Sequence, residues 1–339
     1  MSKDPGKETT FPHTAGQALP GAMAPAGSLP ATTSATSPVL TPASSAPVGP
    51  NPADVLDLLS KPRIHPYQSF FRTSNDRETV GAYLWAQAVT ASLHPFVGLI
   101  EIVLRNAIHI SLSQQCSGGS SQSFAWYDRA QPKSISLQGK SLDRVEELLC
   151  SGMNPPVRIA VQPSPDDVVS NLSFGFWPNV MEGLNMRHSS RAFTDVFCHH
   201  PGSKPKHWSF AKNRELVVLR MKRLQDLRNK ICHFEPVWKL HWLAETTPSP
   251  GNYSHSLQGL RSLHTSLVEL LEWCSPEAVE FYKNTFGWNW FNRLCTSPAI
   301  RSFLADPYAC GYLSPFNDPG APASAQAIVC SVTTTPPAS

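Results

Sequence analysis

The chain has 339 residues, a formal net charge of +3 and 41% hydrophobic residues. Its first residues lack the positive start and apolar run of a signal peptide, and no later apolar run reaches the length that a bilayer requires. These features argue against a secreted or membrane-spanning protein. We therefore expect a soluble, cytoplasmic protein with no membrane partner.

Both ends of the chain have a low-complexity composition. Residues 1–51 and 315–339 are rich in Pro, Ala, Ser and Thr and carry few large apolar side chains. Such segments cannot bury enough apolar surface to fold, so both are expected to be disordered tails. The remaining residues, 52–314, are expected to form one domain.

The first half of the chain shows helical signals. Helices are predicted over 53–59, 67–71, 74–93 and 96–113. His94-Pro95 is expected to separate the last two, because proline disfavours helical geometry in the residue before it. The 96–113 helix places Glu101, Arg105 and His109 at four-residue steps along one side. This spacing allows an ion pair between Glu101 and Arg105 within the helix.

The rest of the chain continues the helical pattern. Polar or irregular loops are predicted over 118–138, 186–210 and 245–251, and helices over 142–150, 164–172, 213–233, 253–274 and from 275 to about 286. Phe174, Phe176 and Trp177 are expected in the core. The sequence shows no convincing strand signal and no repeat of fixed period. The predicted fold class is all-α.

The cysteine and histidine pattern gives little support for a metal. The eight cysteines include no Cys-x-x-Cys pair, so they are expected to be reduced thiols. Cys198, His199, His200 and His207 lie close together in the sequence, and zinc is the minor alternative for them. A structural zinc site normally takes two ligand pairs at short spacings, and no second pair is evident. We expect neither a metal nor another cofactor.

The segment from residue 204 to residue 230 is strongly basic. It carries nine Lys or Arg residues and two acidic ones, and such an excess attracts phosphates. A solvated helix face is the alternative interpretation. The candidate RNA-binding residues are Arg220, Lys222, Arg223 and Lys230.

The helix predicted over 213–233 is amphipathic. Its inner face is expected to hold Leu216, Val217, Leu224, Leu227 and Ile231. Val218, Met221 and Gln225 are expected on an outer surface that meets a second subunit or a partner helix. Arg228, Asn229 and His233 are expected to share one broad face near the end of this helix. Phe234-Glu235-Pro236 is expected to end it.

The sequence RNKICHFEPVW from Arg228 onward resembles the motif of the HEPN family of all-helical ribonucleases. In that motif Arg, a polar residue, three further residues and His stand in order, and the Glu-Pro that follows is similar to the Abi-like, or abortive infection, branch. Residues 101–109 and 172–177 also resemble this branch, so the resemblance covers about residues 67–290. Phe234 departs from the pattern, because a second His often stands there.

This resemblance implies an HEPN-like helical bundle and a metal-independent endoribonuclease that acts in phage defence or as a toxin. His233 would be the general acid and base, Arg228 would stabilise the charged phosphorus centre, and Asn229 would orient the imidazole. The resemblance implies a composite site in a homodimer, braced by Glu101, Arg105 and Glu235. Such an activity implies a neutralising partner, an antitoxin or an RNA.

Two alternatives remain open. The chain can be a helical module that binds RNA without cutting it, or one that docks a protein partner. His233 can simply cap its helix or pair with Glu235. No Gly-rich phosphate loop, metal-spaced carboxylate cluster or Gly-x-Ser-x-Gly elbow is present, which argues against a nucleotide hydrolase, a metallonuclease and an esterase.

Overall fold

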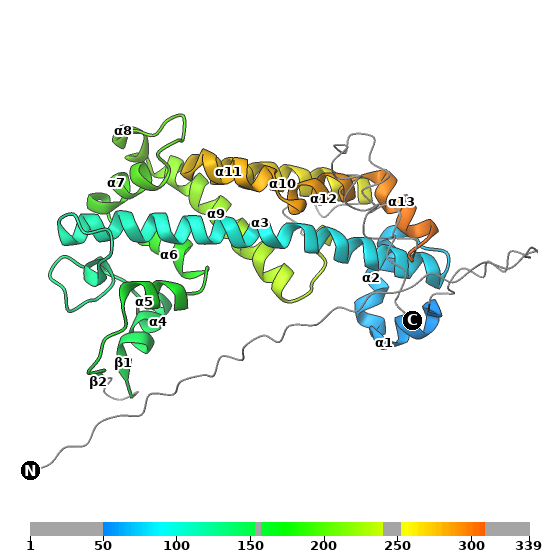
Figure 1. Ribbon diagram of the computed structural model, residues 1–339, viewed down its shortest axis with the longest axis horizontal. Helices are drawn as coiled ribbons and strands as arrows, with labels where there is room; N and C mark the ends of the chain where they lie inside the picture. The colour runs from blue at the N-terminus through cyan, green and yellow to red at the C-terminus, as the bar shows by residue number, and fades with distance from the viewer. Residues whose placement is uncertain (1–49, 153–156, 240–251, 309–339) are drawn as a thin grey trace, which may run out of the picture. The chain divides into compact units, whose positions relative to one another are not determined.

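The computed structural model describes residues 50–152, 157–239 and 252–308, and these residues form an all-α fold (Figure 1). The predicted class is confirmed. The first helix begins at Pro52, where the folded part of the chain was expected to begin. Apart from Pro50 and Asn51, both predicted tails lie outside the described residues, as does the predicted linker over 245–251.

The described part of the chain contains thirteen α-helices and two short 3-10 turns. The helices are α1 (Pro52–Leu58), α2 (Lys61–Phe71), α3 (Asp76–Ser117), α4 (Lys140–Leu149), α5 (Pro165–Asn171), α6 (Phe176–Gly183), α7 (Met186–Val196), α8 (Pro205–Trp208), α9 (Ala211–Cys232), α10 (Tyr253–Cys274), α11 (Pro276–Lys283), α12 (Phe286–Leu294) and α13 (Ser297–Ala305). The 3-10 turns are η1 (Phe124–Trp126) and η2 (Val237–Lys239). Two strands of two residues each, β1 (Cys150–Ser151) and β2 (Val157–Arg158), pair in antiparallel orientation.

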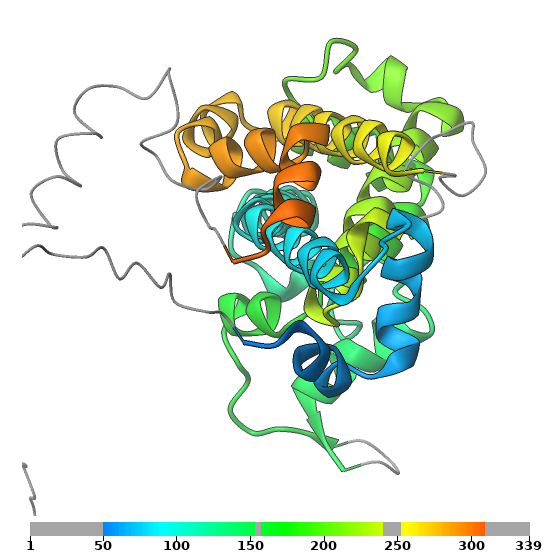
Figure 2. The same cartoon turned by 90° about the vertical axis from the view of Figure 1, so that its right-hand side faces the viewer.

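Helix α3 lies at the centre of the bundle. Helices α1, α2, α7, α9, α10, α12 and α13 all contact it, and Figure 2 shows neighbouring helices around it. The expectation that His94-Pro95 separates two helices is wrong, since α3 continues through Pro95. Proline removes one backbone hydrogen bond. Leu93, Phe96 and Val97 on either side of it are buried, so packing offsets that loss.

The length of α3 bears on the expectation that no apolar run is long enough for a bilayer. Because it is not interrupted at Pro95, α3 is long and apolar enough to cross a membrane by length and composition. Core helices of soluble bundles share this property, and 44% of the apolar window is buried by other parts of the structure. The apolar surface of α3 is thus used, at least in part, for contacts with its neighbouring helices.

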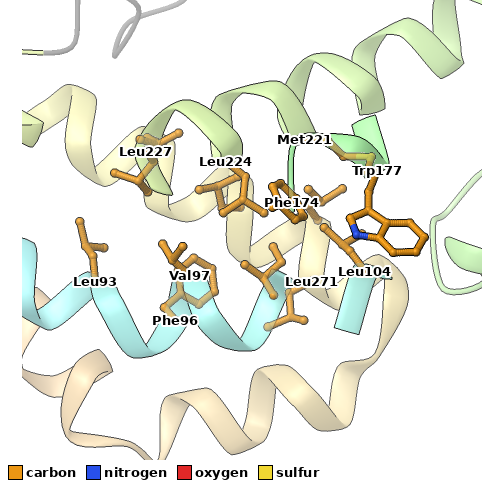
Figure 3. Close-up of a cluster of buried hydrophobic side chains, with 14 of the residues drawn as sticks. Leu93, Phe96, Val97, Leu104, Phe174, Trp177, Met221, Leu224, Leu227 and Leu271 are labelled. Atoms are coloured by element: carbon orange, nitrogen blue, oxygen red, sulfur yellow. The ribbon is translucent and has the colours of Figure 1, made fainter. Parts of the chain in front are cut away.

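A layer of large apolar side chains joins α3 to α9 and α10. Figure 3 shows Leu93, Phe96, Val97 and Leu104 of α3 facing residues of these helices and of the 174–177 segment. Phe174, Phe176 and Trp177 are buried, as predicted. This core fixes the position of α9 within the bundle.

The buried face of α9 is wider than the predicted inner face. Met221 is 0% exposed and Val218 is 5% exposed, whereas both were expected on an outer surface. Leu216, expected inside, is 56% exposed. The reason is that α6 covers α9 on the side where a free surface was expected, in addition to α3 and α10. Met221 and Val218 are therefore core residues and not contacts for a partner.

Two further regions differ from the predicted elements. The segment predicted as an irregular loop over 186–210 contains α7 and α8. Asn185 caps α7, which buries Ala192, Phe193 and Val196 at helical spacing. The last predicted helix, from 275 to about 286, corresponds to α11. Two helices that were not predicted follow it, α12 and α13, which are capped by Thr285 and Thr296 and pack against α3.

Candidate functional site

Helix α9 ends at Cys232 with His233 as its C-cap. The N–H of Phe234 donates to the carbonyl oxygen of Ile231 (3.2 Å), and the N–H of Glu235 donates to that of Lys230 (2.9 Å). This pair of bonds closes a helix when the residue after the cap is left-handed. Phe234 has φ 54°, a conformation that usually requires glycine. The helix therefore ends where predicted, but Phe234 and not Pro236 makes the turn.

This turn forms one wall of a pocket of about 800 Å³. Asn229 and His233 line it from α9, and Arg63 and Tyr67 line it from α2. The Arg63 Nη1 donates to the carbonyl oxygen of Phe234 (3.2 Å), which ties α2 to the turn. Burial raises the pKa of Tyr67 to about 12, so its phenol is neutral at physiological pH.

The pocket is lined by more cations than anions. Arg63, Lys230 and Lys239 line it, together with Asp226 and Glu235. Lys230 pairs with Glu235 and lowers the pKa of that carboxyl through a hydrogen bond. Among the described residues, neither Arg63 nor Lys239 forms an ion pair. With Lys230 and Glu235 paired, Arg63 and Lys239 stand against the single carboxyl group of Asp226, so the lining keeps a small excess of positive charge.

His233 itself is exposed at the pocket. Within the described part of the chain it makes no ion pair with Glu235, which pairs with Lys230 instead. The backbone N–H of His233 donates to the carbonyl oxygen of Asn229 (3.0 Å), so the two residues lie one turn apart. The imidazole and the amide thus face the same pocket, as the spacing predicted.

Arg228 is not among the residues that line this pocket. Its Nε lies 3.8 Å from the Oε2 of Glu101 on α3. Five residues along an α-helix turn the side-chain direction by about 140°, so Arg228 and His233 point to different sides of α9. The structure brings Asn229 and His233 together and directs Arg228 toward α3.

The three residues predicted to support the site have different partners. Glu101 on α3 contacts Arg228 on α9. Burial raises the pKa of Glu101, although the positive charges of Arg228 and Arg105 oppose that shift. The buried Nε of Arg105 has no hydrogen-bond partner among the described residues. Glu235 lines the pocket with its partner Lys230. Of the three, Glu101 is the one that contacts a motif side chain.

His109 is a core residue. Its side chain is 2% exposed, the Nε1 of Trp126 donates to its Nδ1 (3.0 Å), and its Nε2 lies 2.9 Å from the Oε1 of Gln122. Burial lowers its pKa, which favours the neutral imidazole. The imidazole of His109 is buried and hydrogen-bonded in the core, so it is not available to a substrate.

The four cations predicted to bind RNA do not form one surface. The Nη1 of Arg220 lies 2.8 Å from the Oε2 of Glu269 on α10, and its guanidinium stacks over Trp273. The Nζ of Lys222 lies 2.7 Å from a carboxylate oxygen of Glu182 on α6. Arg220 and Lys222 therefore pair with acidic residues on opposite sides of α9. The charge excess read from residues 204–230 is partly neutralised by acids from other helices.

The remaining two predicted cations are Arg223 and Lys230. Arg223 is partly buried on α9, and Lys230 pairs with Glu235 at the pocket. Arg63 and Lys239 were missed as candidates. Their role depends on contacts between segments that are far apart in the sequence, for which local spacing carries no signal.

The Cys and His residues near the end of α7 show no metal geometry. Among the residues that the structure describes, no group of three or more His, Cys, Asp or Glu side chains could hold a metal ion. His200 instead packs against His207, Trp208 and Trp273, with ring centroids 4.4 to 5.0 Å apart. This cluster is an aromatic contact between α8 and α10.

The site therefore consists of an imidazole, an amide and two cations around one pocket, with an arginine–glutamate pair on the adjoining side of α9. No protein-family model, curated protein or solved structure matches the chain.

Proposed function

We propose that the protein is a metal-independent endoribonuclease of the HEPN type, similar to the Abi-like proteins of abortive infection. One observation carries the proposal: His233 and Asn229 face a pocket that is also lined by Arg63 and Lys239. An imidazole can take and return a proton near neutral pH, and cations hold a phosphodiester. The pocket thus combines a proton carrier with an anion site.

The proposed reaction is an internal transfer at phosphorus. The ribose 2′ oxygen attacks the phosphorus while His233 takes the 2′ hydroxyl proton. A 2′,3′-cyclic phosphate forms, the bond to the 5′ oxygen breaks, and a second acid protonates that leaving oxygen. Asn229 holds the imidazole or the phosphate by hydrogen bonds. Arg228 stabilises the charge that develops on the phosphate oxygens.

The second acid is proposed to come from another copy of the chain. A single chain supplies only one His233. On its α9, the side chain of Arg228 points about 140° away from that of His233, toward Glu101. Two α9 ends facing each other across a two-fold axis would supply two imidazoles and would bring an arginine toward each. In this proposal Glu101 holds Arg228 in place until the dimer and the RNA are bound. A neutralising antitoxin or RNA would restrain the activity in the host.

The test is incubation of purified full-length protein with total RNA in excess chelator. His233→Ala is expected to slow cleavage by about 10²- to 10⁴-fold, the usual contribution of a general acid–base residue. His255→Ala is the matched control, because His255 is an exposed histidine on α10. The products of the parent should carry cyclic phosphate ends. Equal cleavage by the parent and His233→Ala would refute the proposed mechanism.

A non-cleaving RNA-binding module is the second candidate. Two observations favour it: Arg228 is engaged by Glu101, and Phe234 stands where a second histidine often follows the motif. This candidate predicts RNA binding that weakens with salt, because cations contact phosphates, and no difference between parent and His233→Ala in RNA integrity. A protein-docking role predicts instead no affinity for RNA.

A further inference from the structure

Phe234 is placed at the pocket without a packing role. Its side chain is 67% exposed, although phenylalanine is normally used to bury apolar surface. Its φ of 54° lies in the left-handed region, where a bulky residue is strained and glycine is not. Neither burial nor backbone geometry therefore accounts for phenylalanine at this position.

The turn fixes the backbone of Phe234. Backbone hydrogen bonds from Phe234 and Glu235 to Ile231 and Lys230 close the end of α9, and Arg63 binds the carbonyl oxygen of Phe234 from α2. A fixed backbone limits where the side chain can lie, so a ligand that packs on it has less chain to order. Phe234 is thus an exposed apolar side chain on a closed turn at the pocket wall.

Positive charge lies beside this ring. Arg63 uses one nitrogen for the carbonyl of Phe234, and among the described residues its other nitrogens donate no hydrogen bond, although its charge also acts on Glu235. Lys239 lines the same pocket, and Glu235 is neutralised by Lys230. An exposed aromatic ring next to cations is the arrangement by which proteins bind unpaired nucleotides, with the base on the ring and the phosphate on the cations. The volume of about 800 Å³ lies within the size of ligand pockets.

We infer that this pocket binds a nucleotide adjacent to the cleaved phosphodiester, with its base stacked on Phe234 and its phosphate held by Arg63 and Lys239. The substrate class is single-stranded RNA, because a paired base does not offer its face to a side chain. The choice of RNA rests on the proposed function. The test below is a binding measurement and does not require cleavage.

The probe is a fluorescein-labelled oligouridylate whose 2′ hydroxyls are methylated, so that it cannot be cut by 2′ attack. Fluorescence anisotropy with the full chain gives the Kd for the single strand and for the same strand annealed to its complement. Phe234→Gly is expected to weaken single-strand binding by about 5- to 100-fold, the effect of losing one stacked base. Phe234→Trp should bind as the parent does. Phe281→Ala is the matched control, since Phe281 is 64% exposed on α11.

Arg63→Gln tests the phosphate contact. It should weaken binding and reduce the slope of log Kd against log salt concentration by about one, as expected for one lost phosphate contact. Arg301→Gln on α13 is its control, because Arg301 is exposed and does not line the pocket.

Thermal unfolding separates binding from folding. Glycine relieves the left-handed strain, so Phe234→Gly should unfold at the same temperature as the parent or higher. Weaker binding by a protein that is no less stable supports the stacking role. The inference is overturned if Phe234→Gly binds the single strand like the parent, if the duplex binds equally well, or if the parent binds neither probe.

The two proposals fail in different ways. A parent that binds the probe through Phe234 but leaves unmodified RNA intact refutes the ribonuclease and keeps the nucleotide site. A parent that cuts RNA while Phe234→Gly binds normally refutes the nucleotide site and keeps the ribonuclease.

Discussion

Burial decides which histidine side chains are free for chemistry. His109 and His264 are 2% and 5% exposed, and each forms a hydrogen bond inside the bundle. His233 is exposed at the end of α9 and faces the pocket. The three residues are indistinguishable by type, and only their surroundings separate a core histidine from a candidate acid and base.

His264 also makes the stability of the protein depend on pH. Burial lowers its pKa to about 4, whereas an unfolded histidine has a pKa of about 6.5. Well above pH 6.5 the residue is neutral in both states. As the pH falls from 6.5 toward 4, the unfolded state binds a proton that the folded state does not, so stability is lost.

We predict that this residue alone lowers the free energy of unfolding by about 2 kcal/mol between pH 7 and pH 5. Urea unfolding at the two pH values measures the change. His264→Gln keeps a polar group for the hydroxyl of Tyr282, which lies 2.9 Å from Nε2, but does not titrate. Its stability should fall less between the two pH values. An equal fall in parent and variant would contradict the assignment.

At the scale of the element, α3 illustrates how packing overrides a local helix breaker. Pro95 lies inside this 42-residue helix, between side chains that are buried against other helices.

Two glycines of α3 differ in the space around them. A Cβ at Gly81 would collide with the carbonyl oxygen of Phe303 and lie 2.7 Å from its carbonyl carbon on α13, whereas a Cβ at Gly98 meets nothing within 4 Å.

We predict opposite effects of alanine at these two glycines. Gly81→Ala should destabilise the protein by about 1–3 kcal/mol, because backbone atoms of α13 must move. Gly98→Ala should stabilise it by about 0.5–1 kcal/mol, because alanine loses less conformational entropy in a helix. Chemical unfolding of both variants checks the prediction. A stable Gly81→Ala protein would show that the α3–α13 contact is looser than described.

At the scale of the whole molecule, the question is whether one chain or two would make the proposed site. Within one chain, α3 and α2 contact opposite parts of the α9 motif: Glu101 contacts Arg228, and Arg63 lies with His233 at the pocket. A site that needs both motif side chains is therefore complete only if a second copy contributes, as the proposed dimer requires.

Mixing of variants tests this dimer. Arg228→Ala and His233→Ala should each be inactive alone, while dimers formed from an unfolded and refolded mixture contain one intact arginine and one intact histidine. We predict cleavage by the mixture that clearly exceeds that of either variant. Size-exclusion chromatography with light scattering gives the oligomeric state of each sample. A monomeric parent that cuts RNA, or a mixture that stays inactive while dimeric, would rule out a shared site.

Much of the fold could be predicted because its signals are local. The helix predicted over 253–274 has the bounds of α10, and Ser164 forms the capping box that begins α5. The spacing of Asn229 and His233 correctly placed both on one side of α9. Periodicity and capping act within a few residues, so the sequence reports them directly.

The sequence by itself thus determined the all-α class, most of its helices and the presence of an imidazole and an amide at the end of α9. The tertiary structure alone decided that α3 continues through Pro95. It also decided that Lys222 pairs with Glu182 and Arg220 with Glu269, and that Arg63 lines the same pocket as His233. Arg63 and Phe234 are 171 residues apart. A contact of this kind forms only when the hydrophobic core brings α2 and α9 together, and no local pattern in either segment encodes it.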